Sequence, residues 1–376
     1  MIPLSLYIHI PWCVRKCPYC DFNSHQAGET VPEDEYIAAL MADLEQELQL
    51  TDVRQCQSIF IGGGTPSLFS AQAMHQIMDG VRARLSLVDD CEITMEANPG
   101  TFEQARFAGF RAAGINRLSL GVQSFDDSCL SALGRIHSAG DAQLAFEKAR
   151  EIGFDNINID LMHGLPGQTQ DLARGDLLKA IALGPEHLSW YQLTIEPNTE
   201  FHARPPSLPV DETLWDIQEM GWQLLANAGY RQYEISGYAQ PGRRARHNLN
   251  YWQFGDYIGI GAGAHGKVTD RRGEVVRRWK LRQPKAYMAA LDKVSGAQVV
   301  AAEDLPFEFM MNVLRLYEGV PSTMFSERTG LPLAVMEPLL QQARQRGMLI
   351  EDITTLAPTP QGRLFLNDLL EIFLAG

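Results

Sequence analysis

Long apolar runs and an excess of positive charge are both missing from this sequence of 376 residues. No stretch reaches the roughly 18 consecutive apolar residues that a membrane-spanning helix needs, so a transmembrane protein is not expected. The first residues, MIPLSLYIHIPWC, lack the basic segment that opens a signal peptide, so we expect the chain to stay in the cytoplasm. Acids outnumber bases by 46 to 32, and the net charge of -14 argues against nucleic-acid binding.

Cysteine is absent from most of the chain, because none of the six lies beyond Cys129. Three of them, Cys13, Cys17 and Cys20, are crowded into one short segment. A disulfide scaffold would not cluster its cysteines in this way, and in a reducing compartment such a group indicates metal ligation or redox chemistry. The others, Cys56, Cys91 and Cys129, are predicted to be small buried hydrophobic residues.

Short β-rich runs alternate with amphipathic stretches through the first half of the chain. The runs are LYIHI, SIFIGGG, EITMEANPG, RLSLGVQ, NINIDLMHG and LSWYQLTIEP, which begin near positions 6, 58, 92, 117, 156 and 188. Helices are predicted over 34–49, 71–85, 102–113, 142–152 and 214–228. Nearly continuous apolar character suits strands buried on both faces of a parallel sheet, so the predicted fold is α/β, a full or partial parallel βα barrel. Polar residues fall where these strands end, which is where α/β enzymes place their sites: Glu96, Gln123, Asp160 and Glu196.

Composition divides the chain into three predicted parts. Residues 1–240 form the barrel, and residues 241–302, rich in Gly, Tyr, Trp and Arg, supply strands and loops that close one side of it. Residues 303–376 show three helices (307–317, 322–329 and 333–346), a strand pair around MLIEDITTLAPTP and a terminal helix, which is the order of a winged-helix-like domain. This last part carries more acids than bases, so a docking or lid module is favoured over DNA recognition.

The most specific motif is C-x3-C-x2-C, formed by Cys13, Cys17 and Cys20 on the loop after the first strand. Three thiolates on a cubane iron–sulfur cluster leave one iron without a protein ligand, free to coordinate a small molecule. A structural zinc site would instead need a fourth ligand, for which His9 and His25 flank the motif. Zinc ligation and three unrelated reduced cysteines are the alternatives to the cluster.

This spacing, with the aromatic Tyr19 before the last cysteine, resembles the signature of the radical S-adenosylmethionine (radical SAM) proteins. The resemblance implies a [4Fe–4S] cluster on the three cysteines, SAM bound to the open iron, and an electron donor for the cluster. It also implies SAM contacts from Tyr7, Tyr19, Gly63, Gly64, Thr65, Glu96, Gln123, Arg135 and Asp160. In this assignment Arg135 pairs with the SAM carboxylate, Asp160 holds the ribose hydroxyls, and the glycines of GGGTP let the main chain approach the methionine amino group.

Further segments narrow the resemblance to one branch of that family. YIHIPWC, CDFN, GGGTPS, EANPG, GVQSF, LGRIH, NIDLMHGLPGQT and YQLTIEPNT are similar to the branch of oxygen-independent coproporphyrinogen III dehydrogenases and HemW haem chaperones. The dehydrogenases carry a further cysteine where this chain has Phe22, and a substantial N-terminal extension where it has five residues before Leu6. Both features favour HemW, with the dehydrogenase as the alternative. HemW implies haem as a third bound group and a haem-accepting partner protein, membrane-associated acceptors included.

The segment HNLNYW, residues 247–252, resembles the HNxxYW motif that HemW proteins carry and that is linked to haem binding. The resemblance makes His247 the candidate haem ligand, because imidazole is a common axial ligand of haem iron. Three arginines just ahead are candidate partners for the haem propionates: Arg243, Arg244 and Arg246. The competing interpretation is a packed, hydrogen-bonded loop histidine. The other histidines considered are His265, a second candidate ligand, and His137 and His163, which lie in motifs closer to the expected SAM site.

Overall fold

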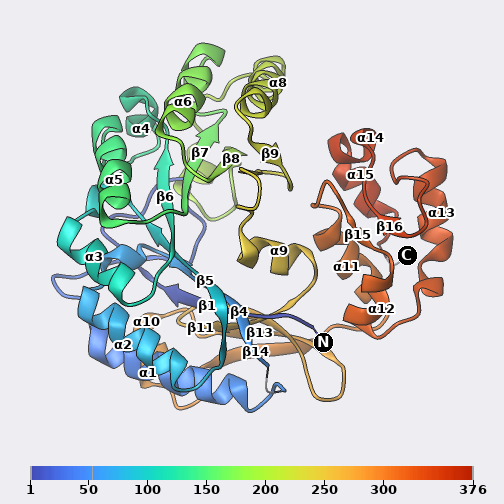
Figure 1. Ribbon diagram of the computed structural model, residues 1–376, viewed down its shortest axis with the longest axis horizontal. Coiled ribbons are helices and arrows are strands. Elements are labelled where there is room, and N and C mark those ends of the chain that lie inside the picture. The colour runs from blue at the N-terminus through green and yellow to red at the C-terminus, as the bar shows by residue number, and fades with distance from the viewer. Residues whose placement is uncertain (1, 53, 375–376) are drawn as a thin grey trace.

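The computed structural model describes residues 2–52 and 54–374, and its central element is a mixed sheet of 12 strands (Figure 1). Neighbouring parallel strands follow one another in chain order: β1 (Leu4–Ile10), β4 (Cys56–Gly63), β5 (Leu87–Ala97), β6 (Arg117–Gln123), β7 (Ile157–His163) and β8 (His187–Gln192). The β-rich runs of the sequence are these strands. The predicted α/β fold with a partial parallel barrel is therefore confirmed.

Helices cover the outer face of the parallel strands (Figure 1). The longer ones are α1 (Glu33–Leu48), α2 (Ala71–Arg82), α3 (Gln104–Ala112), α5 (Ala139–Ile152), α6 (Gln170–Leu183) and α8 (Asp211–Asn227). Short helices α4 (Asp127–Ala132) and α7 (Glu200–Ala203) lie in connections. Ser70, Ser138 and Thr169 each cap a helix by accepting a main-chain N–H from the first turn, so the polar residues before the apolar pattern fix where α2, α5 and α6 begin.

The two faces of the parallel strands differ in chemistry. On β1, Leu6 and Ile8 belong to the main apolar core beneath the helices, whereas Tyr7 and His9 face a cavity on the inner side. On β5, Met95 joins the core, whereas Glu96 faces a cavity on the inner side. The strands are thus buried on both faces, but the inner face is lined by polar groups, and the prediction of nearly continuous apolar character is wrong for that face. A polar interior can hold a charged cofactor; an apolar one cannot.

Further strands extend the sheet at both edges. At one edge β10 (Gly237–Ala239) pairs antiparallel with β8, and β9 (Arg231–Gln232) pairs antiparallel with β10. At the other edge β11 (Asp256–Ile260) pairs parallel with β1. Antiparallel strands β12 (His265–Thr269), β13 (Val275–Lys280) and β14 (Val294–Val299) follow, with α10 (Pro284–Ala289) between the last two. Lys280 Nζ bonds Asp43 Oδ1 at 2.5 Å, a buried ion pair that ties β13 to α1.

The segment over 246–252 departs from the sequence-based prediction. Strands and loops were predicted there, but Arg246–Trp252 form a helix, α9, that packs against β4 and β1. The reason is tertiary: the Glu92 carboxylate of β5 accepts the main-chain N–H groups of Arg246, at 2.9 Å, and of His247, at 3.3 Å. A carboxylate at a helix N-terminus satisfies donors that have no partner within the helix.

The C-terminal part is a compact helical module. It contains α11 (Leu305–Val313), α12 (Thr323–Thr329), α13 (Glu337–Gln345), α14 (Pro360–Leu364), α15 (Leu366–Glu371) and the 3₁₀ turn η3 (Leu333–Val335). The predicted third helix is divided into η3 and α13. The predicted strand pair is wrong in its partners, because β16 (Thr355–Leu356) pairs with β15 (Val320–Pro321), and residues 349 and 358 form only an isolated bridge.

The predicted boundaries at 240 and 302 remain predictions, since β11–β14 belong to the same sheet as the barrel strands. None of the helices within the described residues is both long and apolar enough to cross a lipid bilayer.

Candidate functional site

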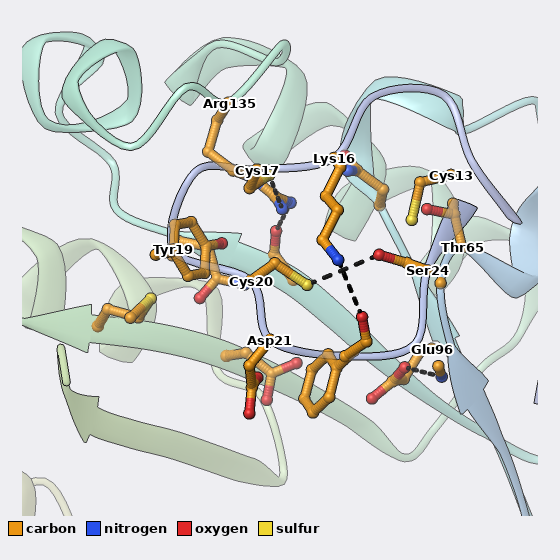
Figure 2. Close-up of a pocket in the computed structure, with 18 of the residues that line it drawn as sticks. Cys13, Lys16, Cys17, Tyr19, Cys20, Asp21, Ser24, Thr65, Glu96 and Arg135 are labelled. Atoms are coloured by element: carbon orange, nitrogen blue, oxygen red, sulfur yellow. Dashed lines mark hydrogen bonds between the residues drawn. The ribbon is translucent and has the colours of Figure 1, made fainter. Parts of the chain in front are cut away.

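A cavity of about 390 Å³, the first cavity, lies at the carboxyl end of the parallel strands. The cysteine loop forms one side of it, and the turn after β4 and the ends of β5 to β8 form the other. Figure 2 shows the three cysteines, Thr65, Glu96 and Arg135 around this hollow. The site therefore lies where the carboxyl ends of parallel strands place ligands in α/β proteins.

The cysteine loop is closed at its base and held from outside. The short strands β2 (Trp12–Cys13) and β3 (His25–Gln26) pair with each other, and Ala27 N–H donates to the Cys13 carbonyl at 2.8 Å. From the turn after β4, Thr65 N–H donates to the Trp12 carbonyl at 2.7 Å. Within the loop, the Lys16 ammonium donates to the Phe22 carbonyl at 3.2 Å. These contacts fix the main chain around the thiols, none of which is in a disulfide.

The three thiols suit a cluster better than a single ion. No three His, Cys, Asp or Glu side chains converge as around one metal ion within residues 2–52 and 54–374. In a cubane, each thiolate binds a different iron, so the donors lie further apart than around one ion. Burial raises the pKa of Cys13 and of Cys20, so both are neutral thiols until a metal binds. Arg135 Nη1 lies 3.7 Å from Cys17 Sγ and points its N–H group at that sulfur.

The histidine that would complete a zinc site is already engaged. His9 Nε2–H donates to the Asn23 carbonyl at 2.8 Å, and His9 Nδ1 accepts from the Tyr7 hydroxyl at 2.7 Å. His25 Nε2 lies 3.3 Å from the Arg282 carbonyl. With both nitrogens of His9 used, the zinc interpretation loses its first candidate for a fourth ligand.

Among the described residues, two polar atoms on the wall of the first cavity are buried and have no hydrogen-bond partner. They are Gln123 Oε1 and Arg135 Nε. Gln123 ends β6 with a φ of 72°, a left-handed conformation that is unfavourable for a side chain of this size and is typical of functional positions. Arg135 projects from the connection between α4 and α5, and its Nη2 donates to the Gly121 carbonyl at 2.6 Å. An acceptor and a donor left open in one cavity fit a polar ligand such as SAM.

Glu96 lies between the first cavity and a neighbouring cavity, and lines both. Its Oε2 accepts Gly63 N–H at 3.0 Å, and burial followed by the nearby Asp160 charge raises the pKa of Glu96 to about 8. The carboxyl group is therefore largely protonated near neutral pH and can donate one hydrogen bond. Gly63, at a φ of 111°, leaves no room for a side chain because the His9 ring would lie 2.5 Å from an added Cβ.

A buried hydrogen-bond network fixes the position of the Asp160 carboxylate. Asp160 Oδ1 accepts from Asn158 Nδ2 and from the Tyr191 hydroxyl, both at 2.7 Å, and Oδ2 accepts from the Ser119 hydroxyl at 2.9 Å. Asn158 Oδ1 in turn accepts from His187 Nδ1 at 2.6 Å. Inward positions on β6, β7 and β8 thus fix the orientation of one carboxylate at the cavity wall.

The first cavity brings together nearly all of the residues that the sequence assigns to the cluster, to SAM and to the strand ends. These are Cys13, Cys17, Tyr19, Cys20, Gly63, Gly64, Thr65, Glu96, Gln123, Arg135, Asp160 and Glu196. Tyr7 is the exception, because it lines a neighbouring cavity and not this one. His137 and His163 are buried away from the cavity; burial lowers the pKa of each to about 4. Tyr191 also lines the cavity but was not predicted from the sequence. Alternate residues of a strand point to the same face, so its position on β8 was the signal that could have identified it.

His247, the residue assigned to haem by the resemblance, lies in a buried contact. Its imidazole is 6% exposed, its Nδ1 bonds Glu92 Oε1 at 3.0 Å, and its ring stacks on Phe60 with centroids 4.4 Å apart. Hydrogen bonds from His247 and the charge of Arg117 outweigh burial and hold the pKa of Glu92 at about 2. Two of the arginines assigned to the propionates already pair with carboxylates: Arg244 with Glu318, and Arg246 with Asp90. His247 is thus packed and hydrogen-bonded, on a helix and not on a loop, and its assignment as the haem ligand stays a prediction.

Two family models match the chain. The Radical SAM superfamily model covers residues 7–175, and the HemN C-terminal domain model covers residues 300–365. In overall structure the chain is similar to coproporphyrinogen III oxidase (HemN) from Escherichia coli, with a TM-score of 0.83 at 23% identity over 99% of this chain and 90% of that one. The fold and the cysteine loop thus define the class, a radical SAM protein with a HemN-type C-terminal domain.

Curated relatives narrow the class. The chain is 55% identical to heme chaperone HemW of Escherichia coli (strain K12) over 99% of its own length and 98% of that protein. It is 51% identical to the protein of the same name from Haemophilus influenzae over 99% and 98%, and 36% identical to that of Bacillus subtilis (strain 168) over 98% and 99%. The chain therefore belongs to the HemW family of radical SAM proteins.

Proposed function

We propose that this protein is a haem chaperone that carries a [4Fe–4S] cluster, binds SAM and haem, and passes haem to an acceptor protein. The observation that carries the proposal is the full-length similarity to relatives named heme chaperone HemW, at 55% identity in the first case. The alternative is an oxygen-independent coproporphyrinogen III dehydrogenase, which the fold alone does not exclude. The free thiols suit the reducing cytoplasm, where we expect the protein to act.

In this proposal Cys13, Cys17 and Cys20 hold the cluster. When bound, a reduced cluster supplies one electron to SAM, and the protein contributes binding, orientation and exclusion of water. The loop contacts from Ala27 and Thr65 keep the first cysteine in place. Lys16 bridges the loop to the Phe22 carbonyl and so limits its opening.

The cavity wall is assigned to SAM by the chemistry of each group. Arg135 has an unpartnered Nε and a guanidinium shape that matches a carboxylate. Gln123 Oε1 is an open acceptor for an ammonium group, and the anchored Asp160 is an acceptor for ribose hydroxyls. Protonated Glu96 is a neutral donor beside them, which limits repulsion of the SAM carboxylate.

Two measurements on anaerobically reconstituted protein separate the candidates. The haem chaperone is expected to retain added haem with a defined stoichiometry and to leave coproporphyrinogen III unchanged. Turnover of coproporphyrinogen without haem retention would establish the dehydrogenase instead. A colourless protein with zinc and no iron–sulfur absorbance would contradict both and support a zinc-stapled interaction protein. A haem-loaded protein incubated with a candidate acceptor then tests transfer through the spectrum of the acceptor.

A further inference from the structure

The end of β6 holds Gln123 in an unfavourable main-chain conformation. Its φ is 72°, and the register between β6 and β7 shifts between Gly121 and Gln123. A residue with a long side chain stays in the left-handed region only where surrounding contacts fix the main chain. The groups that make these contacts therefore decide where the open Gln123 Oε1 lies on the wall of the first cavity.

Asp176 of α6 binds the two residues that follow Gln123. Its Oδ1 accepts the main-chain N–H of Phe125 at 2.6 Å, and the Ser124 hydroxyl lies 2.8 Å from Oδ2 and 3.0 Å from Oδ1. Gln168 Nε2 donates to Oδ2 at 3.2 Å, so three donors share one carboxylate. Asp176 is 2% exposed and Ser124 is fully buried. Hydrogen bonds to a carboxylate are stronger in such surroundings than in water, so this contact holds the chain firmly.

Side chains from the connection between α4 and α5 hold the residues before Gln123. Arg135 Nη2 donates to the Gly121 carbonyl at 2.6 Å, and His137 Nε2–H donates to the Val122 carbonyl at 3.0 Å. The main chain is thus fixed by side chains on both sides of the left-handed residue, as an unfavourable conformation requires.

We propose that Asp176 is a positioning residue for SAM, which fixes the main chain after Gln123 and thereby directs Gln123 Oε1 at the ligand. The inference rests on the proposed function, in which the first cavity binds SAM. Asp176 does not line that cavity, so it acts through Gln123 and not by contact with the ligand. The effect can be large for a small movement, because an acceptor displaced by about 1 Å lies outside hydrogen-bond distance of its former donor.

The charge of Asp176 gives this role a measurable signature. Burial is the largest influence on its pKa and raises it to about 6. The titratable groups that face it are the carboxylate of Asp126, the ammonium group of Lys179 and the thiol of Cys129, whose own pKa burial raises to about 12. An ionised carboxylate accepts from all three donors, whereas a protonated one must donate from one oxygen and loses at least one of them. The contact that fixes Gln123 should therefore weaken as the pH falls through about 6.

The test measures the affinity of labelled SAM for anaerobically reconstituted protein that carries its cluster. Asp176→Asn keeps the shape of the side chain and should weaken SAM binding about two- to tenfold, the range of one hydrogen bond, with cluster absorbance unchanged. Asp171→Asn, in the exposed first turn of the same helix, is the matched control and should leave the affinity unchanged. Ser124→Ala removes one of the three donors and should weaken binding in the same direction, which keeps the test available if Asp176→Asn does not fold.

A double-mutant cycle shows whether Asp176 acts through Gln123. Gln123→Ala alone should weaken SAM binding. Adding Asp176→Asn to this variant should weaken binding by less than about twofold more, because the side chain to be positioned is already gone. Equal losses from Asp176→Asn with and without the Gln123 side chain would overturn the inference.

The pH dependence of SAM binding is a second readout, which a general loss of stability would not reproduce. From about pH 7 to about pH 5.5 the affinity of the wild type should fall by up to about fourfold, because the protein without SAM takes up a proton on Asp176. The affinity of Asp176→Asn should be low and constant over this range. The pKa values of His137, about 4, and of Glu96, about 8, keep both groups largely in one protonation state throughout.

The outcomes separate this inference from the proposed function. Unchanged SAM affinity in folded Asp176→Asn and Ser124→Ala, or the same pH profile in Asp176→Asn and the wild type, would overturn the positioning role and leave the proposed function intact. A reconstituted wild type that binds no SAM would overturn the proposed function and the positioning role with it.

Discussion

Replacing Gly64 with alanine tests how the turn after β4 holds the cysteine loop. An added Cβ would lie 2.5 Å from the Trp12 carbonyl oxygen and 2.9 Å from that of Ile10, about 0.9 Å short of ordinary contact in the first case. These are main-chain atoms, and the strand end is fixed to them because Gly64 N–H and Thr65 N–H donate to the same two carbonyls at 2.7 Å. The turn and the loop must therefore move apart, next to Cys13.

We expect Gly64→Ala to lower the free energy of unfolding by about 1–3 kcal/mol, the usual cost of overpacking. The iron content per chain after reconstitution should fall with it, because the displaced segment carries a cluster ligand. Gly175→Ala is the matched control: among the described residues, no atom outside its chain neighbours and the main chain of its own helix lies within 4 Å of an added Cβ. Alanine should therefore stabilise α6 by about 0.5–1 kcal/mol. Urea unfolding and iron analysis measure both effects. Wild-type stability and iron content in Gly64→Ala would refute the reasoning.

Three further predictions concern the first cavity. Replacing any one of the three clustered cysteines with alanine should abolish iron–sulfur absorbance, whereas alanine at any of the other three cysteines should keep it. An iron ligand among those other three would contradict the prediction, because the cluster would then have no open iron. Arg135→Ala and Asp160→Ala should each weaken SAM binding about ten- to a hundredfold with cluster absorbance retained, because a charge-assisted hydrogen bond is lost; unchanged affinity for labelled SAM removes the residue from the site. The pKa of Glu96 in the folded protein is raised to about 8, so between about pH 4.5 and pH 8 the folded protein keeps a proton that the unfolded chain has released. The stability of the wild type should therefore fall relative to that of Glu96→Gln over this pH range and level off above it. Stability curves that stay parallel would contradict a protonated Glu96.

The strands and the cysteine motif could be predicted because their signals are local. Each run from LYIHI to LSWYQ carries its own β pattern, and several of them end in a Gly or polar residue at the cavity, such as Gly64, Gln123 and Gln192. The helix α9 could not be predicted, because RHNLNYW is short and the N-terminus of the helix depends on Glu92, which is distant in the sequence. Without that carboxylate, polar residues such as asparagine favour turns over helix.

The same limit explains the surroundings of His247 and the polar interior. His247 is close in sequence to Tyr251 and Trp252, but the helix turns these side chains to different neighbours: His247 contacts Glu92, and the two aromatic residues line a cavity of about 570 Å³. The inward residues of the strands were read as apolar runs, although Ser119 and Asn158 alternate with leucine and isoleucine. The alternation of residues along each strand would have shown which residues point to the inner face and which to the outer face. Which of the inner residues join into one hydrogen-bond network depends on the register between strands, which the sequence does not show.

Position 22 links the sequence argument to the two cavities. The dehydrogenase pattern has a cysteine there, and this chain has Phe22, whose side chain is 59% exposed and lines both spaces. A thiol at that border would line the cavity that we propose for SAM, as a weak donor and a redox-active group. A phenyl ring has neither property and instead adds apolar surface there. The substitution therefore removes a group that radical chemistry could use, which agrees better with the proposed haem chaperone than with the alternative dehydrogenase.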